Sequence, residues 1–124
     1  MAREKLSIPQ LKIKANDVRR DVVHMLELAK SGHPGGALGL ADIVTALYFN
    51  IMNIDPQNPE WPERDIFMLS NGHTVPVQYA AMAEAGYFPV EELSTLRKLG
   101  SRLQGHPERV KLPGLENTSG PLGS

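Results

Sequence analysis

The chain has 124 residues, 41% of them hydrophobic and 22% charged, a composition typical of one globular domain. Its formal net charge of −1 gives no electrostatic basis for binding nucleic acid or an anionic membrane surface. The sequence contains no cysteine, which excludes disulfides and thiol chemistry, and no apolar run approaches the roughly 20 residues needed to span a bilayer. The polar N-terminus lacks the pattern of a secretory signal. We therefore expect a cytoplasmic protein that binds neither nucleic acid nor membranes.

Two apolar patterns with helical spacing occupy the first part of the chain. The first predicts an amphipathic helix over residues 11–29, with its apolar face formed by Leu11, Ala15, Val18, Val22, Met25 and Ala29. Ser31-Gly32 is expected to cap this helix, and His24 within it to be a half-buried packing residue. The second pattern predicts a strongly apolar, buried helix over residues 40–51.

Residues 31–39 contain four glycines and a proline around His33, which predicts a loop between these two helices. Such a loop can pass close to a ligand, in which case the imidazole of His33 would face a pocket. A simple connection between helices is the interpretation that composition alone favours.

The stretch from Asp65 to His73 organises the rest of the chain. Its four consecutive apolar residues, 66–69, are typical of a strand buried on both faces of a parallel sheet. A helix is predicted over residues 75–83, with Pro76 near its first turn and Gly86 as the glycine cap that ends it. His73 would then lie where a buried strand ends and a helix begins, a position that favours anionic ligands. Alternatively, His73 only caps the helix.

A single buried strand cannot satisfy its own backbone hydrogen bonds, and each unpaired buried group costs about 1–3 kcal/mol. We therefore expect the strand to need neighbours from another polypeptide or from a longer protein, and the isolated chain to expose apolar surface. After a short helix predicted over residues 90–99, residues 101–124 are expected to form an extended loop.

Three of the four histidines share a local pattern. His33 and His106 each stand between glycine and proline, and His73 follows a glycine. An imidazole on such a restricted, uncovered backbone suits a fixed role in a pocket, where it can exchange protons near neutral pH. No histidine pair has helical metal-ligand spacing, so a zinc site is not predicted.

Together these motifs resemble the transketolase family, and the resemblance runs collinearly from about Ala15 to the last residue. The matching motifs are residues 31–36, 40–43, 55–59, 64–73, 104–107 and 118–123. The region 103–123 is most similar to the N-terminal subunit of split, two-gene transketolases. The resemblance implies an α/β fold, with residues 1–124 as the N-terminal portion of one thiamine diphosphate-binding domain of the pyrophosphate type. This portion would be mostly helical with one buried strand, and incomplete at the C-terminus.

The resemblance also implies an enzyme that uses thiamine diphosphate to move a two-carbon ketol unit between sugar phosphates. By family likeness, His73 contacts the cofactor diphosphate, and Gly120 and Leu122 touch the cofactor through backbone atoms. His33 and His106 line the substrate channel and assist proton transfer.

The ligands for the family's magnesium or calcium ion, and the glutamate that activates the cofactor, are expected outside this chain. We therefore expect no ketol transfer without a C-terminal transketolase subunit or the missing domain, in a homo- or hetero-oligomer. Three alternatives stay open: a non-catalytic remnant or interaction module, a relative of deoxyxylulose phosphate synthase, and a generic helical binding domain.

Overall fold

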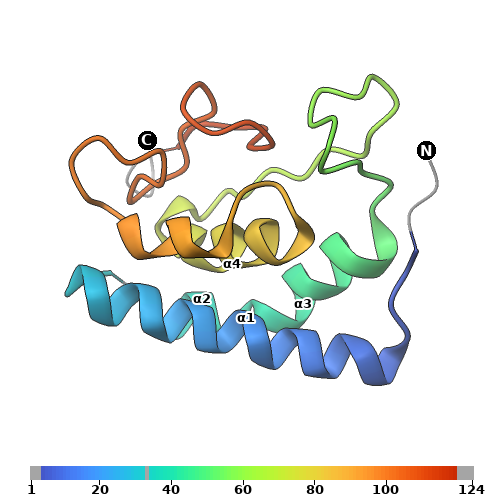
Figure 1. Ribbon diagram of the computed structural model, residues 1–124, viewed down its shortest axis with the longest axis horizontal. Coiled ribbons are helices and arrows are strands. Elements are labelled where there is room, and N and C mark those ends of the chain that lie inside the picture. Colours follow the sequence, from blue (N-terminus) through green and yellow to red (C-terminus); the bar gives the residue numbers. More distant parts are fainter. Residues whose placement is uncertain (1–3, 33, 120–124) are drawn as a thin grey trace.

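The computed structural model describes residues 4–32 and 34–119, which form helices and long irregular segments but no β-strand. The α-helices are α1 (Ile8–Ala29), α2 (Pro34–Gly39), α3 (Ala41–Ala46) and α4 (Val75–Ala85). Shorter helical turns are the π-helical η1 (Leu47–Ile51) and the 3-10 turns η2 (Gly72–Thr74) and η3 (Val90–Thr95). In Figure 1, α1 runs along the base of the molecule, and the irregular segments that follow η1 and η3 lie on the opposite side of α4. None of the helices in the described ranges is long and apolar enough to cross a bilayer.

The long helix α1 confirms the first predicted helix. Ser7 caps its N-terminus in a reciprocal pair with Gln10, so two backbone N–H groups that lack helical partners are satisfied. The predicted apolar face is the buried face, with Ala15, Val18, Val22 and Met25 almost fully covered. The left-handed cap residue is Lys30 (φ 53°), not Ser31-Gly32 as predicted. The prediction of a half-buried His24 is wrong, because its side chain is exposed.

The glycine-rich segment is more ordered than predicted. Residues 34–39 form the short helix α2, with Pro34 at its first position, where the missing N–H costs nothing. The second predicted helix is present as α3 and η1, but it is not buried all round. Val44 and Tyr48 are buried, whereas Ile43 and Ile51 are each 58% exposed.

The predicted strand over residues 66–69 is wrong: the segment is extended but pairs with no other strand in the described ranges. Its side chains alternate, so Leu69 is buried while Ile66 and Met68 are 60% and 63% exposed. A strand needs a neighbouring backbone, and at Leu69 a side chain takes that place. The Asn117 amide donates to the Leu69 carbonyl (3.1 Å) and accepts from the Leu69 N–H (3.3 Å).

Helix α4 is the centre of the core. Residues 75–83 are all buried, because α1, α2, α3 and η3 pack around it. Even Gln78 is fully buried, and its Nε2 donates to the Tyr48 hydroxyl at 2.9 Å. Gly86, with φ 102°, ends the helix as predicted, since this left-handed conformation favours glycine.

The last predicted helix is shorter than expected. It is the 3-10 turn η3, which ends at Thr95 instead of residue 99 because Leu96 leaves the helical region (ψ 128°). Arg97 then adopts φ 62°, and its N–H donates to the Leu103 carbonyl at 2.9 Å. The described part of the segment that follows, residues 101–119, is irregular as predicted.

Candidate functional site

Three segments that are far apart in the sequence meet around Gly72, directly before His73. A Cβ atom on Gly72 would collide with the Ser119 side chain and lie 2.9 Å from Cδ of Pro107. On α2, a Cβ on Gly36 would lie 2.6 Å from Cγ2 of Thr74. The absence of a side chain at these two glycines therefore lets the three predicted histidine motifs pack against one another.

His73 lies in η2, between the extended segment 66–69 and α4, and its side chain is half-buried. This is the junction that the sequence predicted, although the preceding segment is not a strand. The tight turn forms because the N–H and hydroxyl of Thr74 both donate to the Asn71 carbonyl, at 2.9 and 2.8 Å. His73 is consequently held on a short turn, closed by two hydrogen bonds, at the start of the most buried helix.

The start of α4 offers fewer free amides than an ordinary helix N-terminus. The N–H of Thr74 bonds to Asn71, the N–H of Val75 bonds to the Gly72 carbonyl, and Pro76 has no N–H. An anion at this position would therefore depend on side chains such as that of His73 more than on the helix dipole expected from the sequence.

A buried hydroxyl beside Gly72 points to a polar ligand. The Ser119 Oγ is buried and has no hydrogen-bond partner among the described residues. The Ser119 N–H donates to the Pro107 carbonyl at 3.1 Å, which fixes the backbone at this position. A buried hydroxyl without a hydrogen-bond partner is unfavourable unless a ligand or water forms a hydrogen bond with it. The position beside Gly72 and Ser119 therefore suits a polar group such as a diphosphate.

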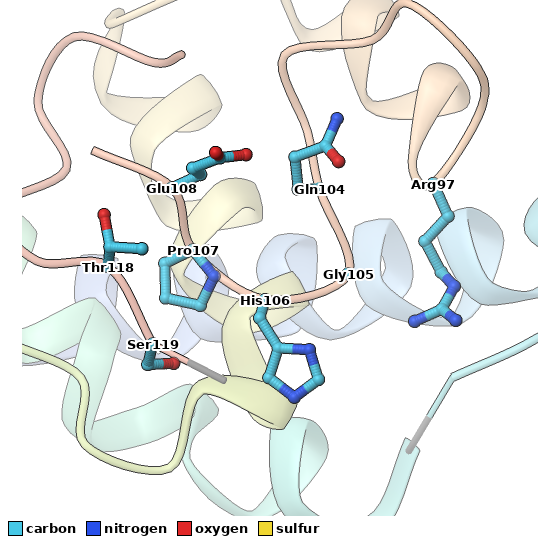
Figure 2. A pocket seen from close by; sticks show the side chains of 8 residues that line it. All are labelled: Arg97, Gln104, Gly105, His106, Pro107, Glu108, Thr118 and Ser119. Atoms are coloured by element: carbon cyan, nitrogen blue, oxygen red, sulfur yellow. The ribbon is translucent and has the colours of Figure 1, made fainter. Parts of the chain in front are cut away.

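His106 lies on an open pocket of about 510 Å³, shown in Figure 2. The pocket is lined by Arg97, Gln104, Gly105, His106, Pro107, Glu108, Thr118 and Ser119. The imidazole of His106 is half-buried, and the following Pro107 is buried. The backbone leading to His106 is anchored to the core, because the Tyr79 hydroxyl on α4 donates to the Gln104 carbonyl at 2.7 Å. Burial raises the pKa of Tyr79, so this hydroxyl keeps its proton and the hydrogen bond persists.

Of the five predicted site residues, two, His73 and His106, lie within the described ranges, and the structure brings their segments together. His73 and His106 are linked through the packing of Gly72 against Pro107 and Ser119. His33, Gly120 and Leu122 lie outside the described residues. Their neighbours Pro34 and Ser119 are described, in α2 and beside Gly72 respectively.

Two residues of the pocket were missed by reasoning from the sequence. The sequence places Arg97 in the last turn of a helix predicted over residues 90–99. Its position beside Gly105 depends on a left-handed backbone conformation that no local sequence pattern predicts. Ser119 falls in the region that the sequence predicts as an extended loop, and no local pattern places its hydroxyl beside Gly72.

Comparison with known proteins assigns the fold. Residues 11–124 match the family model described as "Transketolase, thiamine diphosphate binding domain". The chain is 43% identical over 113 residues to the 6-deoxy-6-sulfo-D-fructose transketolase subunit SqwG of Clostridium sp. (strain MSTE9), covering 91% of this chain and 41% of that protein. It is 46% identical over 125 residues to the chloroplastic transketolase of Spinacia oleracea, covering 98% of this chain and 17% of that protein.

Solved structures agree with this result. Transketolase from Leishmania mexicana superposes with a TM-score of 0.87 at 40% identity, covering 97% of this chain and 18% of that one. A Pichia stipitis transketolase in complex with sedoheptulose-7-phosphate gives a TM-score of 0.86 at 41% identity, covering 91% of this chain and 17% of that one. This chain therefore spans less than half the length of the relatives it matches.

The mostly helical architecture and the convergent histidine motifs are those of a thiamine diphosphate-binding domain. The chain belongs to the transketolase family, in the region of its thiamine diphosphate binding domain.

Proposed function

We propose that residues 1–124 form the N-terminal portion of the thiamine diphosphate-binding domain of a transketolase, which moves a two-carbon ketol unit between sugar phosphates. The observation that supports this most directly is the packing of Gly72 against Pro107 and Ser119, which places the His73 and His106 motifs in one region. The relatives that match this chain carry the names of ketol-transferring enzymes, including one solved with a sugar phosphate.

In this proposal the cofactor's diphosphate lies beside His73 and the Ser119 hydroxyl. The half-buried imidazole donates to a phosphate oxygen, and the unpartnered hydroxyl is satisfied in the same way. The backbones of Gly120 and Leu122 complete the contact. When bound, the thiazolium ring supplies a nucleophilic carbon and an electron sink for breaking the C–C bond beside a ketone.

The substrate then occupies the pocket of His106, with His33 as its second imidazole. Both side chains bind sugar hydroxyls and exchange protons with them, which neutral imidazole performs well near physiological pH. Tyr79 has an indirect role, because its hydrogen bond to the Gln104 carbonyl positions the backbone that carries His106.

The divalent ion of the family is proposed to bind elsewhere in the assembled enzyme. Among the described residues, no group of three or more His, Asp or Glu side chains is arranged to hold a metal. We propose that its ligands, and the glutamate that activates the cofactor, come from parts of the enzyme that this chain does not span. The metal ligands are proposed to come from the rest of this domain, and the glutamate from a second domain or a C-terminal transketolase subunit, in a homo- or hetero-oligomer. The chain alone is then inactive in ketol transfer.

Cofactor binding provides the first test. Isothermal calorimetry with thiamine diphosphate, with and without Mg²⁺, should give at least a tenfold weaker affinity for His73→Gln than for the wild-type chain. His24→Gln is the matched control, because His24 is exposed on α1. Equal cofactor affinity of the wild-type and His73→Gln chains would contradict the role of His73.

Activity provides the second test. The purified chain with thiamine diphosphate, Mg²⁺ and a ketose–aldose pair should show no turnover, and turnover should appear only when both the downstream part of this domain and a C-terminal transketolase subunit or domain are supplied. Turnover by the chain alone would refute the dependence on other parts. A complemented enzyme that stays inactive although cofactor binds would instead favour a non-catalytic remnant.

A further inference from the structure

A pair of carboxyl groups joins α1 to the C-terminal end of α4, and the proposed chemistry gives this pair no role. The two helices pack against each other (Figure 1), and Asp21 on α1 forms a side-chain hydrogen bond with Glu84 on α4. A hydrogen bond between two carboxyl groups needs a proton on one of them, because two carboxylates are only acceptors. The contact between the helices at this point therefore depends on a proton.

The neighbouring charges place this proton on Asp21. Nζ of Lys14 lies 3.2 Å from Oε1 of Glu84 and 3.9 Å from Oδ2 of Asp17, whereas no basic group lies within 4.0 Å of the Asp21 carboxyl among the described residues. Oδ2 of Asp21 is also buried without a hydrogen-bond partner in the described ranges. A negative charge on such a group is unfavourable, so Asp21 is the neutral member of the pair and Glu84 the charged one.

The remaining titratable groups around Asp21 do not supply a compensating charge. On α1, Asp17 disfavours ionisation of Asp21, and the attraction of Lys14 is smaller. From η3, Glu91 lines a small cavity of about 170 Å³ together with Asp21 and His24. Because His24 and Glu91 are exposed, this cavity connects the Asp21 carboxyl to solvent, and its proton can pass to water or a buffer base.

We propose that Asp21 and Glu84 form a proton-dependent latch, which fastens α1 to α4 while the proton is present and releases it when the proton leaves. With both groups ionised, the two carboxylates repel each other, and Asp21 turns toward the cavity and its water. The contact between α1 and α4 then opens locally. The latch is a conformational device of the fold, and it depends on neither cofactor nor substrate.

The direction of the pH effect follows from the environment of Asp21. Burial, followed by the hydrogen bond with Glu84, raises the pKa of Asp21 from 3.8 to about 7. The latch is therefore closed in acid and opens as the pH rises through about 7. Helix α4 also carries Tyr79, whose hydroxyl holds the Gln104 carbonyl, so the latch acts on the helix that supports the pocket loop.

NMR of the side-chain carboxyl carbons in the ¹³C-labelled 124-residue chain observes the proton directly. Asp21 should titrate with a midpoint at about 7, and the Glu84 signal should shift over the same pH range because the groups share the proton. Glu84→Gln should lower the Asp21 midpoint by about one pH unit or more, since the amide can donate to an ionised carboxylate. Glu91→Gln, an exposed position on the same cavity, should leave the midpoint unchanged.

Thiol labelling measures the opening, because the chain has no cysteine of its own. Val18→Cys introduces a thiol on the buried face of α1, and Val75→Cys introduces one in α4, nine residues before Glu84 and hence on the opposite face of that helix. At pH 8, dithiodipyridine should label the Val18→Cys thiol at least about tenfold faster than the Val75→Cys thiol. Adding Asp21→Asn, which keeps a neutral donor at this position, should slow labelling of Val18→Cys at least about tenfold at pH 8 and less than about twofold at pH 4.

Three results would overturn the latch. The first is an Asp21 carboxyl in the wild-type chain that titrates near its ordinary value of 3.8. The second is equal labelling of the Val18→Cys and Val75→Cys thiols at pH 8, which would mean that the chain unfolds as a whole. The third is labelling of Val18→Cys that Asp21→Asn does not slow. None of these measurements involves thiamine diphosphate or a sugar phosphate, so failure of the latch leaves the proposed function in place.

Discussion

The hydroxyl of Tyr79, in the middle of the buried helix α4, donates a hydrogen bond of 2.7 Å to the backbone carbonyl of Gln104. The pocket loop carrying Gly105 and His106 has no regular secondary structure of its own. This hydrogen bond therefore connects the loop to the most buried helix of the core.

Replacing Tyr79 with phenylalanine should lower the free energy of unfolding by about 1–2 kcal/mol, because the partly buried Gln104 carbonyl loses its partner. Urea denaturation measures this loss. Amide hydrogen exchange should also become faster at residues 104–106, with little change in α1. Unchanged exchange at these residues would mean that the hydrogen bond does not position the loop.

A bidentate ion pair joins the two irregular segments that cover α4. Arg64 donates from Nε and Nη2 to the Glu116 carboxylate at 2.7 and 2.9 Å, and both side chains are largely buried. The hydrogen bond to Glu116 raises the pKa of Arg64. A double-mutant cycle of Arg64→Gln and Glu116→Gln should give a coupling energy of about 1–3 kcal/mol.

The pair of Arg20 and Asp17 on α1 provides the comparison for this cycle. Its N–O distance is 3.3 Å, but the Arg20 side chain is 78% exposed. Its coupling energy should be below about 0.5 kcal/mol. Equal values for the two pairs would show that burial and bidentate geometry contribute nothing here.

The carboxyl of Asp21 should make stability depend on pH. Burial, followed by a hydrogen bond shared with Glu84, raises the pKa of Asp21 from 3.8 to about 7. Between these values the native chain keeps a proton that the unfolded chain releases. The stabilisation is therefore complete below pH 3.8 and is lost as the pH rises to about 7.

Asp21→Asn removes this titration. The melting temperatures of Asp21→Asn and wild type should be nearly equal at pH 4, and that of Asp21→Asn should be about 3 °C higher at pH 8. Glu27→Gln, an exposed carboxylate on the same helix, should leave the pH profile unchanged. A constant difference between Asp21→Asn and wild type across this range would exclude a raised pKa.

Gly72 should tolerate no side chain. Gly72→Ala should displace Ser119 and Pro107, lower the melting temperature and weaken thiamine diphosphate binding at least tenfold. Adding Ser119→Gly should recover part of the stability, because it removes one of the two colliding groups.

Gly39 is the matched control for this substitution. No atom lies within 4 Å of the position of its Cβ, so Gly39→Ala should be neutral or stabilise α2 by up to about 1 kcal/mol. If the two alanine variants behaved alike, the close packing around Gly72 would not matter for the site.

The exposed apolar residues of the extended segment should promote association. Ile66 and Met68 line a second open pocket together with Val110, which is 86% exposed. The double variant Ile66→Thr, Met68→Thr should bind less hydrophobic dye and elute later in size-exclusion chromatography. Leu99→Thr, an isolated exposed position, should change neither measurement.

Sequence reasoning predicted the parts of the fold that depend on local periodicity. The buried face of α1 and the Gly86 cap of α4 follow directly from spacing and glycine chemistry. The strand predicted at residues 66–69 was wrong because an apolar run indicates burial but does not show that a partner strand is present. In the absence of a partner strand, only Leu69 of this run is buried. Helix α2 was missed because its glycines disfavour a helix locally, while packing against α4 stabilises it.

For the site, the motifs identified His73 and His106, and the structure adds their spatial relation. No pattern of spacing places Ser119 beside Gly72 or Arg97 across Gly105, because both contacts depend on how irregular segments return over α4. The pairing of Arg64 with Glu116 is of the same kind, since 52 residues separate the partners.

The carboxamide of Asn117 imitates a neighbouring peptide group, because it both donates to and accepts from the backbone of Leu69. One edge of the extended segment is therefore already occupied at that residue. Any strand that came to lie alongside residues 66–69 would have to pair with the opposite edge, or else displace the Asn117 carboxamide and replace both of its hydrogen bonds to Leu69.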